Sequence, residues 1–284
     1  MKRKQQTPSS LQPDPPFSHL RPTSAWYCYQ TRTRRKSSPS LEQVREGERL
    51  AVSDINFVEH ETGMNQQSRI LEIGCAWGRH SLELARRGYQ QVESLDVCEA
   101  LVTTARERAT KAGDTLSLLA LDYLDYHTDT PFDIILSLYD RSCLGQPDNA
   151  QDHNSLQHLA RLLQPGGHLV FGICDWPRDL PLPSRSWEEI EEGFELHEVL
   201  SERTTMKCTH RTLLLRSDGS REIYELTRIH YDLAQVSTLL AKTNFQLVSA
   251  YHAFDHERPY GSENEGLVVV AQQQKLPMLD SHKR

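Results

Sequence analysis

The residues whose spacing best suits ligand chemistry lie between positions 69 and 80, where an apolar run leads into a turn of small residues. The run 70–73 has the composition of a buried parallel strand, and the turn places Gly74, Ala76 and Gly78 at alternate positions. Glycines let a backbone approach a ligand closely, and a helix beginning near Arg79 directs unpaired N–H groups toward it. The spacing therefore predicts a ligand-binding turn between a strand and a helix.

Two acids follow at the ends of the next predicted strands. Asp96 comes at the end of the run 92–97, 22 positions after Gly74, and Asp122 follows the run 116–121. The carboxyl ends of parallel strands meet at one edge, where ligands bind. Asp96 is placed to accept hydrogen bonds from a ribose diol, and Asp122 to accept one from an adenine amino group. Taken alone, each acid is better explained as a helix cap or turn residue.

Alternating strands and helices must position these residues. The pattern predicts a helix from Ser40 and another at 99–112, and a helix face through 156–163. Further strands are expected at 132–138 and 168–173. The fold class expected is α/β, with a Rossmann-like, doubly wound, seven-stranded sheet.

The C-terminal half changes character. Asp218-Gly219 separates two β-type runs and predicts a hairpin, within a small antiparallel insertion at about 185–231. Asp232 is expected to cap a helix, and the segments 245–251 and 266–271 to complete the sheet as a C-terminal antiparallel hairpin. One domain at 41–274 is expected, with a C-terminal tail at 275–284.

Charge divides the chain unevenly. The first 40 residues carry eight Lys/Arg and one Asp, which leaves 24 basic and 38 acidic side chains in the remainder, at a net charge of −14. An acidic body argues against nucleic acid as the main partner, because phosphate contacts need clustered Lys and Arg. The basic, proline- and serine-rich tail 1–40 is expected to be mostly disordered, with an aromatic lid near 25–29.

Composition excludes several other classes. Hydrophobic residues at 37% and charged residues at 25% are typical of a soluble globular protein, and no apolar run approaches the length of a membrane span. Without an apolar leader the chain is expected in the cytoplasm, as a monomer or homodimer that does not bind membranes. The six scattered cysteines indicate neither a disulfide framework nor a metal site, so no metal is expected.

The turn does not match a dinucleotide site, which needs glycine at positions 74, 76 and 79. Its form is acid-x-Gly-x-small-x-Gly, beginning at Glu72. With the motifs 95–96, 121–122 and 163–167 in the expected order, residues 41–272 resemble the class I S-adenosylmethionine-dependent methyltransferases. Ala76 departs from the usual middle glycine, and a slightly reshaped turn is expected there.

The resemblance implies S-adenosylmethionine as cofactor, with the glycine turn against its methionine part, Asp96 on the ribose and Asp122 on the adenine. The cofactor-binding residues it implies are Glu72, Gly74, Ala76, Gly78, Asp96, Val97, Asp122, Tyr123 and Leu138. Within the class, the Gly-Arg-His-Ser helix start and the antiparallel insertion resemble small-molecule methyltransferases, many of which act on amines.

The acceptor side of the site is expected after the fourth strand. Tyr139 and Asp140 are the candidate catalytic residues, with Asp140 placed to orient an ammonium group and Arg141 a carboxylate. The alternative for Asp140 and Arg141 is a local surface ion pair or helix cap. Asp175 and Trp176 are expected at the same edge. His80 is interpreted as an early helix residue, and no general base is assigned.

Three functions remain in competition. The first is methyl transfer to a small-molecule acceptor, more to nitrogen than to oxygen. The second keeps the cofactor but transfers another alkyl group or cyclises the aminobutyrate moiety. The third is a nucleic-acid-associated protein docked by its basic tail.

Overall fold

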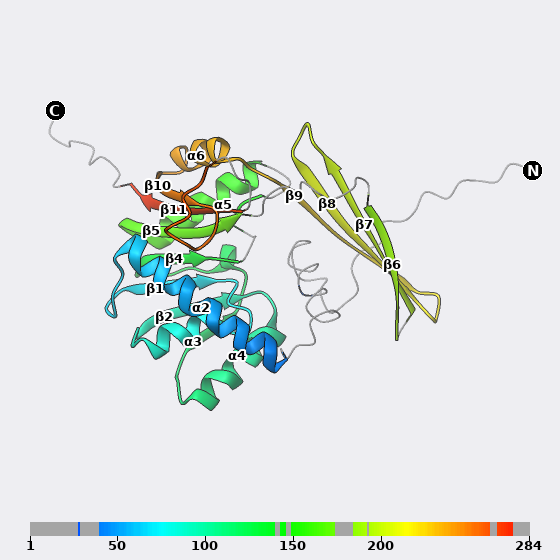
Figure 1. The fold of residues 1–284 in the computed structure, drawn as a ribbon, viewed down its shortest axis with the longest axis horizontal. Coiled ribbons are helices and arrows are strands. Elements are labelled where there is room, and N and C mark those ends of the chain that lie inside the picture. The colour runs from blue at the N-terminus through cyan, green and yellow to red at the C-terminus, as the bar shows by residue number, and fades with distance from the viewer. Residues whose placement is uncertain are drawn as a thin grey trace, which may run out of the picture.

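The computed structural model describes residues 28, 40–139, 143–145, 149–173, 184–191, 193–261 and 266–274. Within them the chain forms two sheets, one of seven strands and one of four (Figure 1). The four-stranded sheet stands beside the rest of the fold and joins it through the end of β9.

The seven-stranded sheet has the order β10-β11-β5-β4-β1-β2-β3. Its strands are β1 (Arg69–Ile73), β2 (Gln91–Asp96), β3 (Ser117–Ala120), β4 (Phe132–Ser137), β5 (Leu163–Ile173), β10 (Phe245–Tyr251) and β11 (Leu267–Gln273). β1 to β5 pair in parallel, whereas β11 runs antiparallel to both β5 and β10. This is the predicted Rossmann-like sheet with its C-terminal antiparallel hairpin, and β1 lies at the point where strand order reverses.

Helices cover both faces of this sheet. On one face lie α2 (Leu41–Thr62), α3 (Arg79–Arg86) and α4 (Glu99–Ala112). On the other lie α5 (Asn149–Leu162) and α6 (Leu233–Ala241), together with the short 3₁₀ helix η1 (Tyr123–Asp125). Strands covered on both faces need continuous apolar runs, which explains the composition of β1 and β4.

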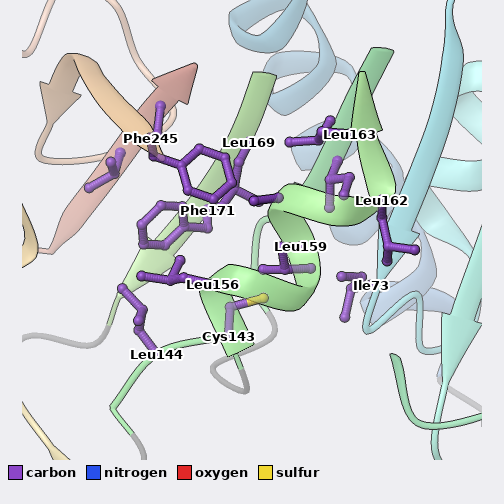
Figure 2. Packing of buried hydrophobic residues seen from close by; sticks show 14 of the residues in the cluster. Ile73, Cys143, Leu144, Leu156, Leu159, Leu162, Leu163, Leu169, Phe171 and Phe245 are labelled. Atoms are coloured by element: carbon purple, nitrogen blue, oxygen red, sulfur yellow. The ribbon is translucent and has the colours of Figure 1, made fainter. Parts of the chain in front are cut away.

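The largest buried cluster lies between the sheet and α5. Figure 2 shows Leu156 and Leu159 of α5 pointing toward Leu169 and Phe171 of β5, with Phe245 of β10 beside them. These five side chains are at most 1% exposed. They fix α5 on the sheet and so hold β4 and β5 in register with β1.

Capping motifs define the starts of two helices. Ser40 and Gln43 form a reciprocal capping box at α2, and Asp232 and Gln235 form another at α6. Both satisfy backbone N–H groups that a first helical turn leaves unpaired. The helix starts at Ser40 and Asp232 that the sequence predicts are thereby confirmed.

The insertion is a four-stranded antiparallel meander of β6 (Ser184–Ile190), β7 (Gly193–Glu202), β8 (Lys207–Arg216) and β9 (Arg221–Ile229). The hairpin predicted at Asp218-Gly219 joins β8 to β9, with Gly219 at φ 83°. Strand β6 was not predicted as a strand, because its sequence Ser-Arg-Ser-Trp-Glu-Glu-Ile lacks a clear apolar alternation. This segment forms a strand because it pairs with β7, not because of its own composition.

The packing of α5 gives a stability prediction. Leu156 is fully buried, whereas Leu41 at the start of α2 is 80% exposed. We expect Leu156→Ala to lower the free energy of unfolding by about 2–5 kcal/mol, since it removes buried methyl groups and leaves a cavity. Leu41→Ala should stay within about 0.5 kcal/mol of the parent chain. Urea denaturation followed by circular dichroism measures both, and equal midpoints for the two variants would contradict this packing.

Candidate active site

The predicted glycine turn lies at the carboxyl edge of the sheet, between β1 and α3. Gly74, Ala76 and Gly78 all have positive φ, of 75°, 49° and 78°. The N–H groups of Gly74 and Cys75 donate to the Leu95 carbonyl, at 2.8 and 3.0 Å. Gly78 precedes α3 without a side-chain cap, so the first turn of the helix directs its N–H groups at the edge of the sheet.

Ala76 has a φ of 49°, in the left-handed region that a residue with a Cβ disfavours by roughly 1–2 kcal/mol. One compensation is direct, because the Ala76 N–H donates to Asp96 Oδ2 at 2.9 Å.

Asp96 ties the end of β2 to this turn. Its Oδ1 accepts from the Cys98 N–H at 2.8 Å, while Oδ2 accepts from Ala76. Asp96 is 3% exposed, and these two backbone bonds fix its carboxylate at the edge of the sheet. The glycine turn and Asp96, the residue expected to bind the ribose, are thus joined by a hydrogen bond.

The predicted cofactor residue Glu72 lies in a buried polar network. Glu72 is 2% exposed; Oε1 lies 3.0 Å from His80 Nδ1, and Oε2 accepts from the hydroxyls of Ser81 and Ser94. Both oxygens therefore have internal partners, which anchor α3 against β1 and β2.

His80 is the centre of this buried network, not merely an early helix residue. Its Nε2 lies 3.0 Å from Asp54 Oδ2, opposite the Nδ1 contact with Glu72. Burial acts to lower the pKa of His80, but hydrogen bonds to Asp54 and Glu72 raise it above its ordinary value. Burial likewise acts to raise the pKa of Glu72, yet hydrogen bonds from His80 and Ser81 bring it below its ordinary value.

Tyr139 connects the end of β4 to the same network. Its hydroxyl donates to Asp54 Oδ1 at 3.1 Å, and its ring stacks on His80 at 5.9 Å between centroids and 9° between planes. The guanidinium of Arg79, the first residue of α3, lies 4.2 Å above the centroid of the Tyr139 ring. Burial of the hydroxyl and the charge of Asp54 raise the pKa of Tyr139 above its ordinary value. The phenol therefore stays protonated at neutral pH.

The remaining predicted cofactor-binding residues are Asp122, Tyr123, Leu138 and Val97. Asp122 caps η1 by accepting from the Leu124 N–H at 3.1 Å. Tyr123 is buried and donates to Ser155 of α5, and Leu138 packs in the core beside Val170. Both side chains are buried in these contacts. Val97 stays partly exposed beside Ala76.

Several predicted site residues lie outside the described residues. They are Asp140, Arg141, Asp175 and Trp176, together with the aromatic segment 25–29 apart from Cys28. Cys28 itself is 2% exposed and packs against Cys98 and Leu101, with its Sγ 3.8 Å from the Val97 carbonyl. One residue of the predicted lid segment is thus placed beside Asp96.

Asp54 and the bridging role of His80 were missed by sequence reasoning. A signal was present: Asp54 falls on the face of α2 that carries Ala51, Ile55 and Val58, all fully buried. An acid on a core-facing stripe needs a buried partner, and the histidine of the Gly-Arg-His turn is a suitable cation.

Comparisons with known proteins agree with this geometry. Residues 70–167 match the family described as Methyltransferase domain. A ubiquinone biosynthesis O-methyltransferase of Alkalilimnicola ehrlichii is 29% identical over 138 residues, which is 46% of this chain and 53% of that protein. Nodulation protein S of Rhizobium tropici is 33% identical over 102 residues, 36% of this chain and 41% of that protein. The chain therefore spans about half the length of the curated relatives it matches.

A solved S-adenosylmethionine-dependent methyltransferase from Clostridium acetobutylicum has the same fold, with a TM-score of 0.64 over 88% of this chain and 97% of that one, at 13% identity. The glycine turn, Asp96 and Asp122 lie within residues 70–167, the part of this chain that is similar to the methyltransferase-domain family. In the described part of the chain, no helix is long and apolar enough to cross a membrane.

The left-handed turn gives a binding prediction. At Gly78 an added Cβ would sit 3.0 Å from the Ala105 Cβ at φ 78°, whereas at Gly113, φ 81°, it would meet nothing within 4 Å. We expect both alanine variants to lose roughly 1–2 kcal/mol of stability through strain. Only Gly78→Ala should weaken S-adenosylmethionine binding, by about tenfold, because only that turn lies at the sheet edge where we expect the cofactor. Calorimetric titration measures this, and equal affinities would contradict the placement.

The buried charges predict a pH dependence. The lowered pKa of Glu72 makes its stabilisation present above pH 4.5 and lost as pH falls through the lowered value. The raised pKa of His80 makes its stabilisation present below pH 6.5 and lost as pH rises through the raised value. Removing one member of a buried pair costs about 3–5 kcal/mol.

We therefore expect the stability difference between the parent chain and Glu72→Gln to be largest between pH 4.5 and 6.5 and to shrink on both sides. Urea denaturation across this range measures it. Glu46→Gln on exposed α2 surface is the matched control. A difference that did not vary with pH would show that His80 and Glu72 do not form a charged pair.

Proposed function

We propose that this chain transfers a methyl group from S-adenosylmethionine to a small-molecule acceptor, with nitrogen preferred over oxygen. The observation that carries the first part is the unit formed by the glycine turn and Asp96, joined through the Ala76 N–H. It combines a close-approach backbone, an uncapped helix N-terminus and a carboxylate at one sheet edge. The residue types present fit the methionine part and ribose of the cofactor.

The cofactor supplies an already activated methyl group on a sulfonium. The chain's own task is then to hold the acceptor in line and exclude water. Gly74 and Gly78 hold the backbone close to the bound molecule, while Asp96 orients the ribose. Tyr139, half exposed beside the turn, is the described residue best placed to meet the acceptor.

The preference for nitrogen rests on protonation. His80 is held as a cation between two carboxylates, and the raised pKa of Tyr139 keeps its phenol protonated. Neither can take a proton from a hydroxyl, which an oxygen acceptor requires, whereas an uncharged amine needs no base to attack. The relatives include an O-methyltransferase, so the acceptor atom of this chain is part of the proposal.

Product analysis tests the reaction. We expect the full chain, incubated with S-adenosylmethionine and panels of matched amines and alcohols, to release S-adenosylhomocysteine, faster with the amines. Mass spectrometry separates this product from methylthioadenosine, which cyclisation of the aminobutyrate moiety would leave. Methylthioadenosine as the main product would favour that alternative reaction.

Asp96→Asn is the matched test of the site. We expect it to weaken S-adenosylmethionine binding by roughly ten- to a hundredfold, the value of a hydrogen bond to a charged group. Asp114→Asn, before the amino end of β3, should bind like the parent chain. Unchanged affinity in Asp96→Asn would refute the ribose assignment.

A further inference from the structure

Asp54 links the acceptor side of the site to the cofactor turn. It is 3% exposed on α2, and its two oxygens have different partners. Oδ1 accepts from the Tyr139 hydroxyl at 3.1 Å, and Oδ2 lies 3.0 Å from His80 Nε2. α2 thereby contacts both the residue that follows β4 and the helix that follows the glycine turn.

The proton positions in this link follow from its geometry. His80 has a carboxylate 3.0 Å from each ring nitrogen, and a neutral imidazole would present a lone pair to one of them. His80 is therefore an imidazolium that donates on both sides. Its donation to Oδ2 leaves Asp54 Oδ1 as the acceptor that fixes the Tyr139 hydroxyl.

The charges that face His80 balance. Asp54 on α2 and Glu72 on β1 are negative, and His80 and Arg79 on α3 are positive, with an Arg79 nitrogen 4.0 Å from Asp54 Oδ2. Tyr139 adds a neutral ring stacked on the imidazolium. A balanced buried cluster has a defined arrangement, since removing any one charge leaves another without compensation.

The direction of the Tyr139 proton decides what the phenol presents to an acceptor. Because the O–H bond points at Asp54, the oxygen lone pairs are directed away from α2. The phenol oxygen can then accept hydrogen bonds from N–H groups but cannot donate one. The Arg79 side chain is already such a partner of the hydroxyl, so an acceptor amine would share the oxygen with it. An amine held in this way has its N–H toward Tyr139, which leaves its own lone pair free to point elsewhere.

We propose that Asp54 is a positioning residue that, bound to His80, sets the Tyr139 hydroxyl as a hydrogen-bond acceptor for an acceptor amine that still carries an N–H. This inference rests on the proposed methyl transfer and adds a substrate class to it: primary and secondary amines are methylated, and tertiary amines are not. Asp54 acts through Tyr139 and touches neither the cofactor nor the acceptor.

The test is a double-mutant cycle on the full chain, with phenethylamine as the amine probe and N,N-dimethylphenethylamine as its tertiary counterpart. We expect Asp54→Asn and Tyr139→Phe each to lower kcat/KM for phenethylamine about tenfold, the order of one hydrogen bond. The double variant should be no worse than Tyr139→Phe, because Asp54 acts through that hydroxyl. Affinity for S-adenosylmethionine should stay within twofold, and Glu46→Gln on the same helix should match the parent chain.

Additive losses in the cycle, or methylation of the tertiary amine at the rate of phenethylamine, would overturn the inference. Loss of S-adenosylmethionine binding in Asp54→Asn would also overturn it, since Asp54 would then support the cofactor turn alone.

A second readout needs no turnover. The pKa of His80, followed by NMR and assigned with His80→Gln, should fall in Asp54→Asn because the amide would place an N–H donor or a neutral oxygen at Nε2. An unchanged His80 pKa would overturn the inference. If the parent chain bound S-adenosylmethionine but released no S-adenosylhomocysteine with any amine, methyl transfer to amines would fail, while a lowered His80 pKa would still support the link between α2 and the turn.

Discussion

The imidazolium of His80, held between Asp54 and Glu72, is the interaction on which the site depends. It joins α2, β1 and α3, and through the Tyr139 hydroxyl it reaches the end of β4. Burying three ionised groups is costly unless each is paired and hydrogen-bonded. Here the cost is offset because every oxygen and nitrogen of the three groups faces a partner, with Ser81 and Ser94 completing the set around Glu72.

This arrangement explains why the glycine turn can carry strain. Ala76 occupies a left-handed conformation that alanine disfavours, and the flanking Gly78 is packed against Ala105. Asp96, at the end of β2, accepts a hydrogen bond from the Ala76 N–H of the turn. Glu72 of β1 contacts His80, which fixes the start of α3. A turn fixed from both directions keeps its N–H groups oriented before any ligand arrives, which lowers the ordering cost of binding.

Much of the fold was predictable from local patterns. The strand-turn-helix at β1, the capping boxes at Ser40 and Asp232, and the hairpin at Asp218-Gly219 each depend on residues close together in the chain. Strand β6 was not predictable in this way, because only its pairing with β7 makes it a strand. The doubly wound, seven-stranded sheet was predicted from the motif order and the resemblance, and the antiparallel strand β11 agrees with the expected final hairpin.

At the site, only the contacts between residues close together in the chain were predictable. The turn and Asp96 lie within 23 positions, and their bond at Ala76 agrees with the expected shared edge. The Tyr139 bond to Asp54 spans 85 positions and the His80 bond to Asp54 spans 26, so spacing alone does not reveal them. The contacts of Glu72 with His80, Ser81 and Ser94 were not predicted either, because a motif records that an acid is present without recording what the acid contacts.

A crystal structure of the full chain with S-adenosylhomocysteine tests the account most directly. The account predicts that the ribose hydroxyls lie within hydrogen-bonding distance of the Asp96 carboxylate, with the homocysteine part against the backbone of Gly74 to Gly78 and the sulfur facing the side of Tyr139. A ligand bound away from this turn, or one whose ribose does not contact Asp96, would contradict it.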